Sequence, residues 1–251
     1  MDFEIKPKEW DEIVKLECVS LDAGERYATG LTEVDLCLAG GDAAIVTVSR
    51  AGLTTPLADL CCGLEAPETG MVHFLDQPWD AKSHRQAARD RGCIGRVWPN
   101  AAWVGNLDID ENILLPQCHH TGRSDSELQE ESQMLARSFG LEDLPHTRPA
   151  WTPEDIRRKS QWVRAFMGTP HLLLLEYPDD DANDADRTCL VEAVEQARMR
   201  GTAVIWITAR RDIALGDQFG TVYRAELTGS SLIWNTQKNR IGTITKENAR
   251  E

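Results

Sequence analysis

Short apolar runs alternate along the chain with stretches in which apolar residues recur every three or four positions. Eight runs predict β-strands, at residues 14–19, 34–38, 43–48, 72–75, 94–98, 172–175, 204–208 and 222–227. Strands that alternate with helices indicate an α/β fold with a mostly parallel core sheet. The first strands, which no helix separates, indicate an N-terminal antiparallel β flap.

Three segments carry the spacing of amphipathic helices. Residues 56–64 place their apolar side chains on one face, with Thr54 and Thr55 available as caps and Pro56 tolerated in the first turn. A capping box from Ser124 to Glu127 opens a second helix, and helical spacing resumes over residues 156–167. We therefore expect one domain over residues 1–251, with a helical subdomain inserted at residues 101–168.

Composition narrows the class of protein. The 41 acidic and 27 basic residues give a formal net charge of −14, which would repel nucleic acid. No apolar run approaches the roughly 20 residues that a membrane-spanning helix needs, so we expect no direct membrane insertion. The opening residues lack the basic flank and apolar stretch of a signal peptide. Seven cysteines without a C-x-x-C pair favour reduced thiols and a cytoplasmic location.

The stretch from Gly41 to Pro78 carries the most specific pattern. A predicted strand leads to the loop T-V-S-R-A-G-L-T-T at residues 47–55, then to a predicted helix and the turn G-L-E-A-P-E-T-G at residues 63–70. This resembles the ATP-binding-cassette (ABC) family, in which a G-x-x-x-x-G-K-[ST] loop precedes a G-L-x-x-P-x-x-G turn. Segments at residues 94–100, 107–116, 164–178 and 208–210 continue the resemblance in the family's order. It implies an ABC-type P-loop NTPase fold.

The loop departs from the family where phosphate would bind. In the family, glycines let backbone N–H groups converge on phosphate and a lysine contacts its outer oxygens. Here Thr47 and Arg50 replace glycines and Leu53 replaces the lysine. The resemblance implies a vestigial ATP site at Tyr27, Ser49, Gly52, Thr54, Thr55 and Glu176. In it, Thr54 could place a hydroxyl near Mg²⁺ and Tyr27 could stack on adenine.

The other motifs of the family also lack their chemical groups. Glu176 stands at the metal-binding aspartate of the Walker B strand, and Tyr177 replaces the carboxylate that activates water, a task for which a phenol with a pKa near 10 is unsuited. Further replacements fall at the Q-loop glutamine, the switch histidine, the D-loop aspartate and the L-S-G-G-Q signature: Pro99, Ala209, Asn183 and residues 152–156. Glu154 and Asp155 of this last segment would repel a γ-phosphate.

Several other features have a simpler interpretation beside the functional one. Cys118, His119 and His120 invite a metal site, but adjacent side chains diverge, and we favour an exposed loop. The acidic run at residues 179–184 imitates a calcium loop without its glycine or its final glutamate. In the family the Q-loop region forms the groove for a coupling helix of the permease, so Trp98 and Trp103 either contact that partner or pack the subdomain on the core. Residues 157–159 are either a docking patch or a solvated face.

The resemblance implies a partner and, through the losses, a role. A permease subunit is expected, with the same chain or a related ABC ATPase as dimer partner, and residues 112–141 resemble the branch that serves phospholipid trafficking. Each ATP in an ABC dimer is enclosed by one P-loop and the partner's signature, so this chain would damage both sites. The leading hypothesis is a pseudo-ATPase subunit that has no catalytic residue and needs neither ATP nor metal. A weak ATPase with Arg50 in place of the lysine, or a non-hydrolysing ATP sensor, is the alternative.

Overall fold

The computed structural model describes residues 12–235. The opening residues, where we expect no signal peptide, lie outside this range. The strands are β1 Val14–Leu21, β2 Leu31–Leu38, β3 Ala43–Thr47, β4 Thr69–Phe74, β5 Gln77–Pro78, β6 Ile94–Val97, β7 Leu172–Glu176, β8 Ala203–Thr208, β9 Val222–Thr228 and β10 Ser231–Trp234. The helices are α1 Leu57–Cys61, η1 Trp79–Ala81, α2 His84–Arg91, α3 Ile109–His120, α4 Asp125–Ser138, η2 Pro149–Trp151, α5 Glu154–Phe166 and α6 Asp184–Met199.

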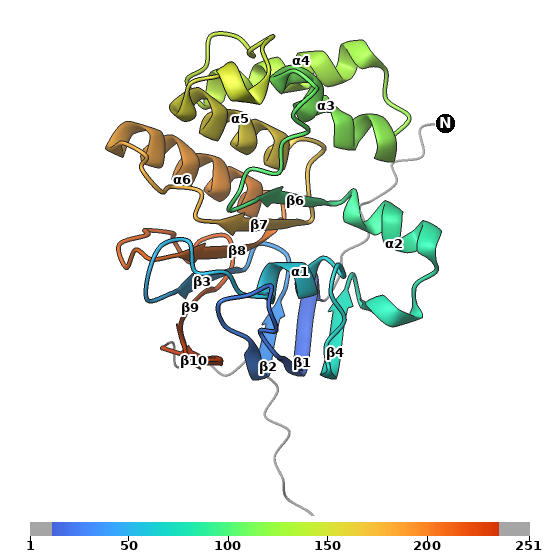
Figure 1. Ribbon diagram of the computed structural model, residues 1–251, viewed down its shortest axis with the longest axis vertical. Helices are drawn as coiled ribbons and strands as arrows, with labels where there is room; N and C mark the ends of the chain where they lie inside the picture. Colours follow the sequence, from blue (N-terminus) through green and yellow to red (C-terminus); the bar gives the residue numbers. More distant parts are fainter. Residues whose placement is uncertain (1–11, 236–251) are drawn as a thin grey trace, which may run out of the picture.

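Two sheets form the centre of the molecule (Figure 1). The larger has the order β10-β9-β3-β8-β7-β6, and its pairs from β9 to β6 are parallel. β7 and β8 are buried along their whole length, as expected of parallel strands covered on both faces. The smaller sheet, β2-β1-β4-β5, is antiparallel and confirms the predicted flap.

Alternate residues of the parallel strands feed two separate cores. Ala44, Leu174 and Ile205 pack with the flap and α1, whereas their neighbours Leu173 and Trp206 pack with the helices on the other face. The second core holds the side chains of α3, α4 and α5, which lie together above the sheet (Figure 1). Within residues 12–235, no helix combines the length and the apolar composition that crossing a lipid bilayer requires.

The helix after the loop differs from the prediction. Instead of spanning residues 56–64 it covers only Leu57–Cys61, and its N-cap is Pro56, without a side-chain cap. The predicted caps Thr54 and Thr55 are thus wrong, because the N-cap position falls on Pro56. Leu64, expected on the buried face, lies beyond the helix and is 44% exposed. The strands β5 and β10, the helices α2, α3 and α6, and the short helices η1 and η2 were not specified from the sequence.

The predicted capping box is confirmed. The Ser124 hydroxyl accepts from the Glu127 N–H at 3.4 Å, and a Glu127 carboxylate oxygen accepts from the Ser124 N–H at 2.8 Å. α4 begins directly after it, with Leu128 and Phe139 fully buried against α5. The segment of Cys118, His119 and His120 is the exposed last turn of α3, so the expectation of a loop there was wrong.

Candidate functional site

α1 begins too far along the chain for the loop between β3 and α1 to present its N–H groups to phosphate in the way the family does. Proline disfavours helical backbone at the residue before it, so Pro56 prevents α1 from starting at Thr55 or earlier. The N–H groups of residues 53–55 therefore precede the helix instead of forming its positive first turn. Ser49 and Gly52 are exposed, and Gly52 has a φ of +71°. The loop thus keeps the glycine turn at Gly52, but the first turn of a helix, whose N–H groups would bind phosphate, does not follow it directly.

Both threonines of the vestigial site have other roles. The Thr54 hydroxyl accepts from the Ala28 N–H at 2.9 Å, and the Thr54 carbonyl accepts from the N–H groups of Ala28 and Thr29. The predicted metal-directed hydroxyl thus holds the preceding loop. Thr55 is buried, with 4% of its surface exposed, and its hydroxyl oxygen has no hydrogen-bond partner in the described part of the chain.

Glu176, at the end of β7, is bound by an arginine. Arg96 of the neighbouring strand β6 donates from Nε to the Glu176 Oε1 at 2.8 Å, and its Nη2 lies 2.7 Å from the same oxygen. Burial raises the pKa of Glu176 above its usual value, and the Arg96 charge opposes that shift. Burial acts to lower the pKa of Arg96, but the Glu176 charge and the neighbouring groups outweigh it and leave that pKa raised. The carboxylate that the resemblance assigns to Mg²⁺ already has a cation.

The same guanidinium reaches the loop side of the site. Arg96 Nη1 donates to Asp59 Oδ1 of α1 at 2.7 Å, and the Tyr27 hydroxyl donates to Asp59 Oδ2 at 2.7 Å. Arg26 lies 3.6 Å from the same carboxylate and 5.5 Å from the Tyr27 ring centroid. Burial raises the pKa of Tyr27, with the Asp59 contact adding to the shift. Four of these residues, Tyr27, Asp59, Arg96 and Glu176, form what we call the Arg96 cluster.

Tyr177 ties the end of β7 to the loop. Its hydroxyl donates to the backbone carbonyl of Leu53 at 2.5 Å, so the Tyr177 side chain is bonded to the main chain at the position of the replaced lysine. Burial raises the pKa of Tyr177, followed in effect by the charge of Glu176. Its backbone has a φ of +51°, a strained value for a residue other than glycine. A phenol held in this way cannot accept a proton from water at neutral pH.

A cavity of about 250 Å³ lies between the loop, the residues after β7 and the N-terminus of α5. Its wall carries three carboxylates, Glu154, Asp180 and Asp181, and one guanidinium, that of Arg158. Burial raises the pKa of Asp180, and the charges of Asp179 and Asp181 add to the shift. Because like charges repel, a triphosphate would be disfavoured in this space.

The remaining replaced motifs have structural roles. Thr152 is buried and donates to the Arg148 carbonyl at 3.1 Å, and Glu154 pairs with Arg157 in the first turn of α5. Asn183 caps α6, its side chain accepting from the Asp186 N–H at 2.9 Å. Pro99 is exposed, whereas Ala209 packs on the first core.

Other side chains that were considered as sites in the sequence make contacts within the fold. Among residues 12–235, no three His, Cys, Asp or Glu side chains come close enough to hold a metal ion. Asp179, first in the acidic run, is buried and accepts from the Trp206 indole at 3.3 Å. Arg158 and Lys159 both pair with Asp186 of α6, at 3.6 and 2.6 Å, so this part of α5 is held against α6.

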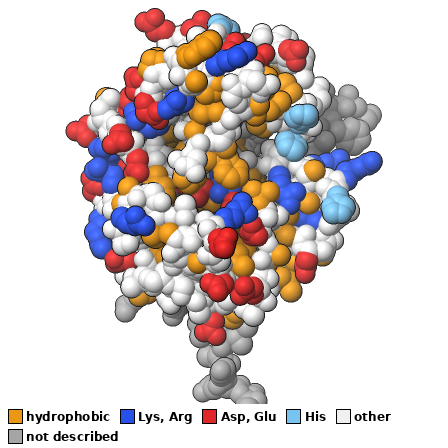
Figure 2. Space-filling model, in the orientation of Figure 1, with side chains coloured by type: hydrophobic (Ala, Val, Ile, Leu, Met, Phe, Trp, Pro, Cys, Tyr) orange, Lys and Arg blue, Asp and Glu red, His pale blue; other side chains and the backbone are white. Residues whose placement is uncertain are grey.

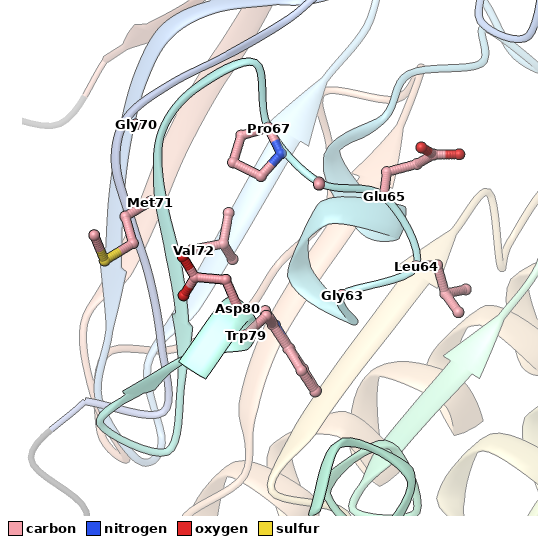
Figure 3. Close-up of a pocket in the computed structure, with 10 residues that line it drawn as sticks. Gly63, Leu64, Glu65, Pro67, Gly70, Met71, Val72, Trp79 and Asp80 are labelled. Atoms are coloured by element: carbon pink, nitrogen blue, oxygen red, sulfur yellow. The ribbon is translucent and has the colours of Figure 1, made fainter. Parts of the chain in front are cut away.

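Two adjoining hollows lie on the other side of Arg96. The first, of about 230 Å³, separates the core from the helical subdomain, and Trp98 lines it with its ring 3.5 Å from the Arg96 guanidinium carbon. The second, of about 390 Å³, lies between the end of α1, β4 and η1, with Met71 and Trp79 on its walls (Figure 3). Leu64 lines both hollows. Trp103 packs against the second core.

Comparisons with known proteins agree with this architecture. No protein-family model matches the chain. The lipoprotein-releasing system ATP-binding protein LolD of Idiomarina loihiensis is 28% identical over 206 residues, covering 80% of this chain and 87% of LolD. The methionine import ATP-binding protein MetN 1 of Yersinia pestis is 25% identical over 223 residues, covering 86% of this chain and 64% of that protein.

Solved structures decide the fold. The dimeric structure of MJ0796, described as a bacterial ABC transporter cassette, superposes with a TM-score of 0.74 at 17% identity over 87% of this chain and 96% of that one. The chain has the fold of an ATP-binding cassette. A post-hydrolysis form of the same protein, bound to ADP and Pi, gives a TM-score of 0.73 at 19% identity. The chain is thus similar in fold to a protein that binds ADP and Pi. In this chain, Glu176 is bonded to Arg96 and Tyr177 to the Leu53 carbonyl.

Sequence reasoning missed the residue at the centre of the cassette's site. It placed Glu176 and Tyr27 in one site, and the Arg96 cluster does bring them together, but through Asp59 and Arg96. The signal was present: a charged Arg96 stands inside the apolar run at residues 94–98, on a strand parallel to the one that ends in Glu176. A buried charge on a central strand requires an opposite charge nearby.

Proposed function

We propose that the chain is a pseudo-ATPase: a cassette that serves as a structural or regulatory subunit of an ABC transport complex without turning over ATP. The observation that carries this is the bond between Arg96 and Glu176, at 2.7–2.8 Å, in a place where both side chains are less than 10% exposed. A metal ion would have to displace a guanidinium that also holds Asp59. Tyr177, bonded to Leu53, leaves the chemistry without a base.

The partners follow from the family resemblance. A transmembrane permease and a second cassette, either a copy of this chain or a related subunit, are the partners that suit an ABC-type cassette. Such a subunit would lie on the cytoplasmic face of the membrane and bind it through the permease. We take the hollow beside Trp98 as the site for a coupling helix, because it lies in the segment that the family uses for that contact. A lipid-like cargo is the finer proposal, supported by residues 112–141 and by the name of one relative, a lipoprotein-releasing protein.

Calorimetry with the purified chain and Mg-ATP, followed by phosphate release with and without a co-expressed permease, tests the proposal. We expect no binding at millimolar nucleotide and no release in either case. LolD of Idiomarina loihiensis, handled identically, serves as the positive control. The Glu176→Gln variant removes the carboxylate that the family resemblance assigns to the metal, and Glu192→Gln, an exposed change on α6, is its matched control.

Each alternative has its own signature in the same experiment. Turnover that Glu176→Gln abolishes and Glu192→Gln preserves would refute the pseudo-ATPase and identify an unconventional ATPase. Micromolar binding without release would identify an ATP sensor. In either case the geometry of the Arg96 cluster would have to open when nucleotide enters, and Arg96 would be expected to exchange its bond to Glu176 for one to phosphate.

A further inference from the structure

The cavity of about 250 Å³ beside the loop, here called the carboxylate cavity, has an unbalanced charge. Glu154, Asp180 and Asp181 line it together with one guanidinium, that of Arg158. Glu154 pairs with Arg157, whereas Asp180 and Asp181 have no ion-pair partner in the described part of the chain. Over the helical subdomain and α6, by contrast, acidic and basic side chains lie intermixed on the face shown in Figure 2. The carboxylate cavity therefore offers negative charge to a ligand.

A buried amide on α5 lacks a hydrogen-bond partner at the same cavity. Gln161 lines the cavity with 8% of its surface exposed, and its Oε1 accepts no hydrogen bond from residues 12–235. Burying an acceptor without a donor is costly, and a ligand that donates to this oxygen would remove the cost. The unpaired oxygen points to a ligand independently of the carboxylates.

Arg158 provides an unpaired donor one turn earlier on the same helix. Its Nη1 donates to the Asp180 carbonyl at 3.4 Å, and its Nη2 lies 3.6 Å from a carboxylate oxygen of Asp186. These contacts hold the guanidinium, but its Nε is buried and has no acceptor among residues 12–235. Because residues three and four apart share a helix face, Glu154, Arg158 and Gln161 stand along one side of α5. The carboxylate cavity thus presents a donor and an acceptor, both unpaired, within one turn of one helix.

The lining of the carboxylate cavity suits an organic molecule better than a metal ion. Among the described residues, no three carboxylate, imidazole or thiol groups come close enough to hold a metal ion. An elongated molecule can reach carboxylates that lie apart. Val97, Trp98 and Pro178 add apolar wall, which suits an aliphatic chain. A space of about 250 Å³ corresponds to roughly eight water molecules at about 30 Å³ each, which is the scale of a single amino acid.

We infer that the carboxylate cavity binds a basic amino acid. The ligand's carboxylate would accept from Arg158 Nε, and its α-ammonium group would donate to Gln161 Oε1, so both unpaired atoms gain a partner. Its side-chain cation would pair with Asp180 and Asp181. Burial and the neighbouring carboxylates raise the pKa of Asp180, and a bound cation would oppose that shift. The inference does not rest on the proposed function, because it requires only the charge and the unpaired groups of this cavity.

Calorimetry of the full chain with lysine and with arginine, each beside two analogues, tests the site. Norleucine lacks the side-chain ammonium group of lysine, and cadaverine lacks its carboxylate. Citrulline and agmatine are the equivalent analogues of arginine. At roughly 0.15 M salt, where surface charges are screened, we expect at least one of the two amino acids to bind about tenfold more tightly than both of its analogues, since hydrogen bonds to charged groups contribute roughly that much.

Two substitutions separate recognition from folding. Asp181 has a φ of +58°, a conformation that asparagine adopts readily, so Asp181→Asn removes a charge and keeps the backbone. Gln161→Met replaces the unpaired amide by an apolar side chain of similar size. Each should weaken binding of the basic amino acid at least about fivefold. Asp125→Asn, an equal change of charge at an exposed residue of α4, should leave the binding unchanged, and urea denaturation of each variant checks that it folds.

Several results would overturn the inference. These are the absence of heat with either amino acid up to about 10 mM, equal binding of each amino acid and its uncharged analogue, and binding that neither Asp181→Asn nor Gln161→Met weakens. Cadaverine or agmatine binding as tightly as its parent would assign the cavity to a diamine instead. Binding of Mg²⁺ or Ca²⁺ that Asp181→Asn abolishes, with no binding of the amino acids, would assign it to a metal. ATP turnover would refute the pseudo-ATPase and leave these titrations unchanged, so the two proposals fail separately.

Discussion

Replacing Arg96 by methionine gives the most direct test of the Arg96 cluster. The side chains of Arg96, Asp59 and Glu176 are 8%, 7% and 6% exposed. The substitution therefore leaves Glu176 buried without its cation, and leaves Asp59 with the more exposed Arg26. Removing one partner of a buried ion pair costs about 3–5 kcal/mol. For a chain of this size, that loss lowers the melting temperature by roughly 6–20 °C, at 2–4 °C per kcal/mol.

Urea denaturation of four proteins measures the coupling: the unmodified chain, Arg96→Met, Glu176→Gln and the double variant. We expect the double variant to lose at least about 1 kcal/mol less stability than the sum of the two single losses. In the double variant, the loss of Arg96 no longer leaves the charge of Glu176 without its partner. Arg211→Met is the matched control, since Arg211 pairs with Glu226 at the surface, and should cost less than about 1 kcal/mol. A loss below 1 kcal/mol for Arg96→Met, as roughly expected of a surface pair, or strictly additive losses, would refute the reasoning.

The same variant has an expected pH dependence. Burial already raises the pKa of Glu176, and Arg96 is the charge that opposes the shift. A carboxyl whose pKa is raised on folding binds its proton more tightly in the folded chain, so the stability this contributes is present at low pH and lost as the pH rises through the folded pKa. The destabilisation by Arg96→Met should therefore be smaller near pH 5 than near pH 7.5, as roughly follows from that linkage. A loss that grows on acidification would contradict it.

Two further changes probe the loop. Thr55→Val replaces a buried hydroxyl that lacks a partner with a methyl group of the same shape, and should raise the free energy of unfolding by about 1 kcal/mol, measured by urea denaturation; a loss would show that the hydroxyl is hydrogen-bonded in solution. Tyr177→Phe removes the bond to the Leu53 carbonyl and should cost about 1 kcal/mol, with faster amide hydrogen exchange in residues 49–55; unchanged exchange would mean that the bond does not hold the loop.

The sequence was a good guide to the fold because its strands are strongly apolar. The run at residues 172–175 could hardly be anything but a central strand, and the capping box at Ser124 placed α4 to the residue. α1 was predicted too long because helical spacing continues through Leu64, whereas the chain leaves the helix after Cys61. The hairpin to β10 was missed because residues 231–234 are too short a run to stand out.

The candidate site was less accessible from sequence. The replaced motif positions could be named from the sequence one at a time. Which side chain now pairs with a remaining polar group, such as Glu176, depends on which strands are neighbours. β6 ends at Val97 and β7 begins only at Leu172, yet the two strands pair in register, which brings Arg96 beside Glu176. The cavity's carboxylates likewise come from α5 and from the residues after β7. Contacts of this range are set by the sheet order.

If the chain is the proposed pseudo-ATPase, Pro56 and the Arg96 cluster would make a nucleotide site hard to restore. Restoring a lysine at Leu53 would add a cation to a loop whose N–H groups still precede the helix, because Pro56 fixes where α1 begins. Freeing Glu176 would require Arg96 to be replaced, and that step alone is expected to destabilise the folded chain. On that proposal, a single reversion would gain no activity and could lose stability, so selection for stability would tend to keep this cassette in its present form.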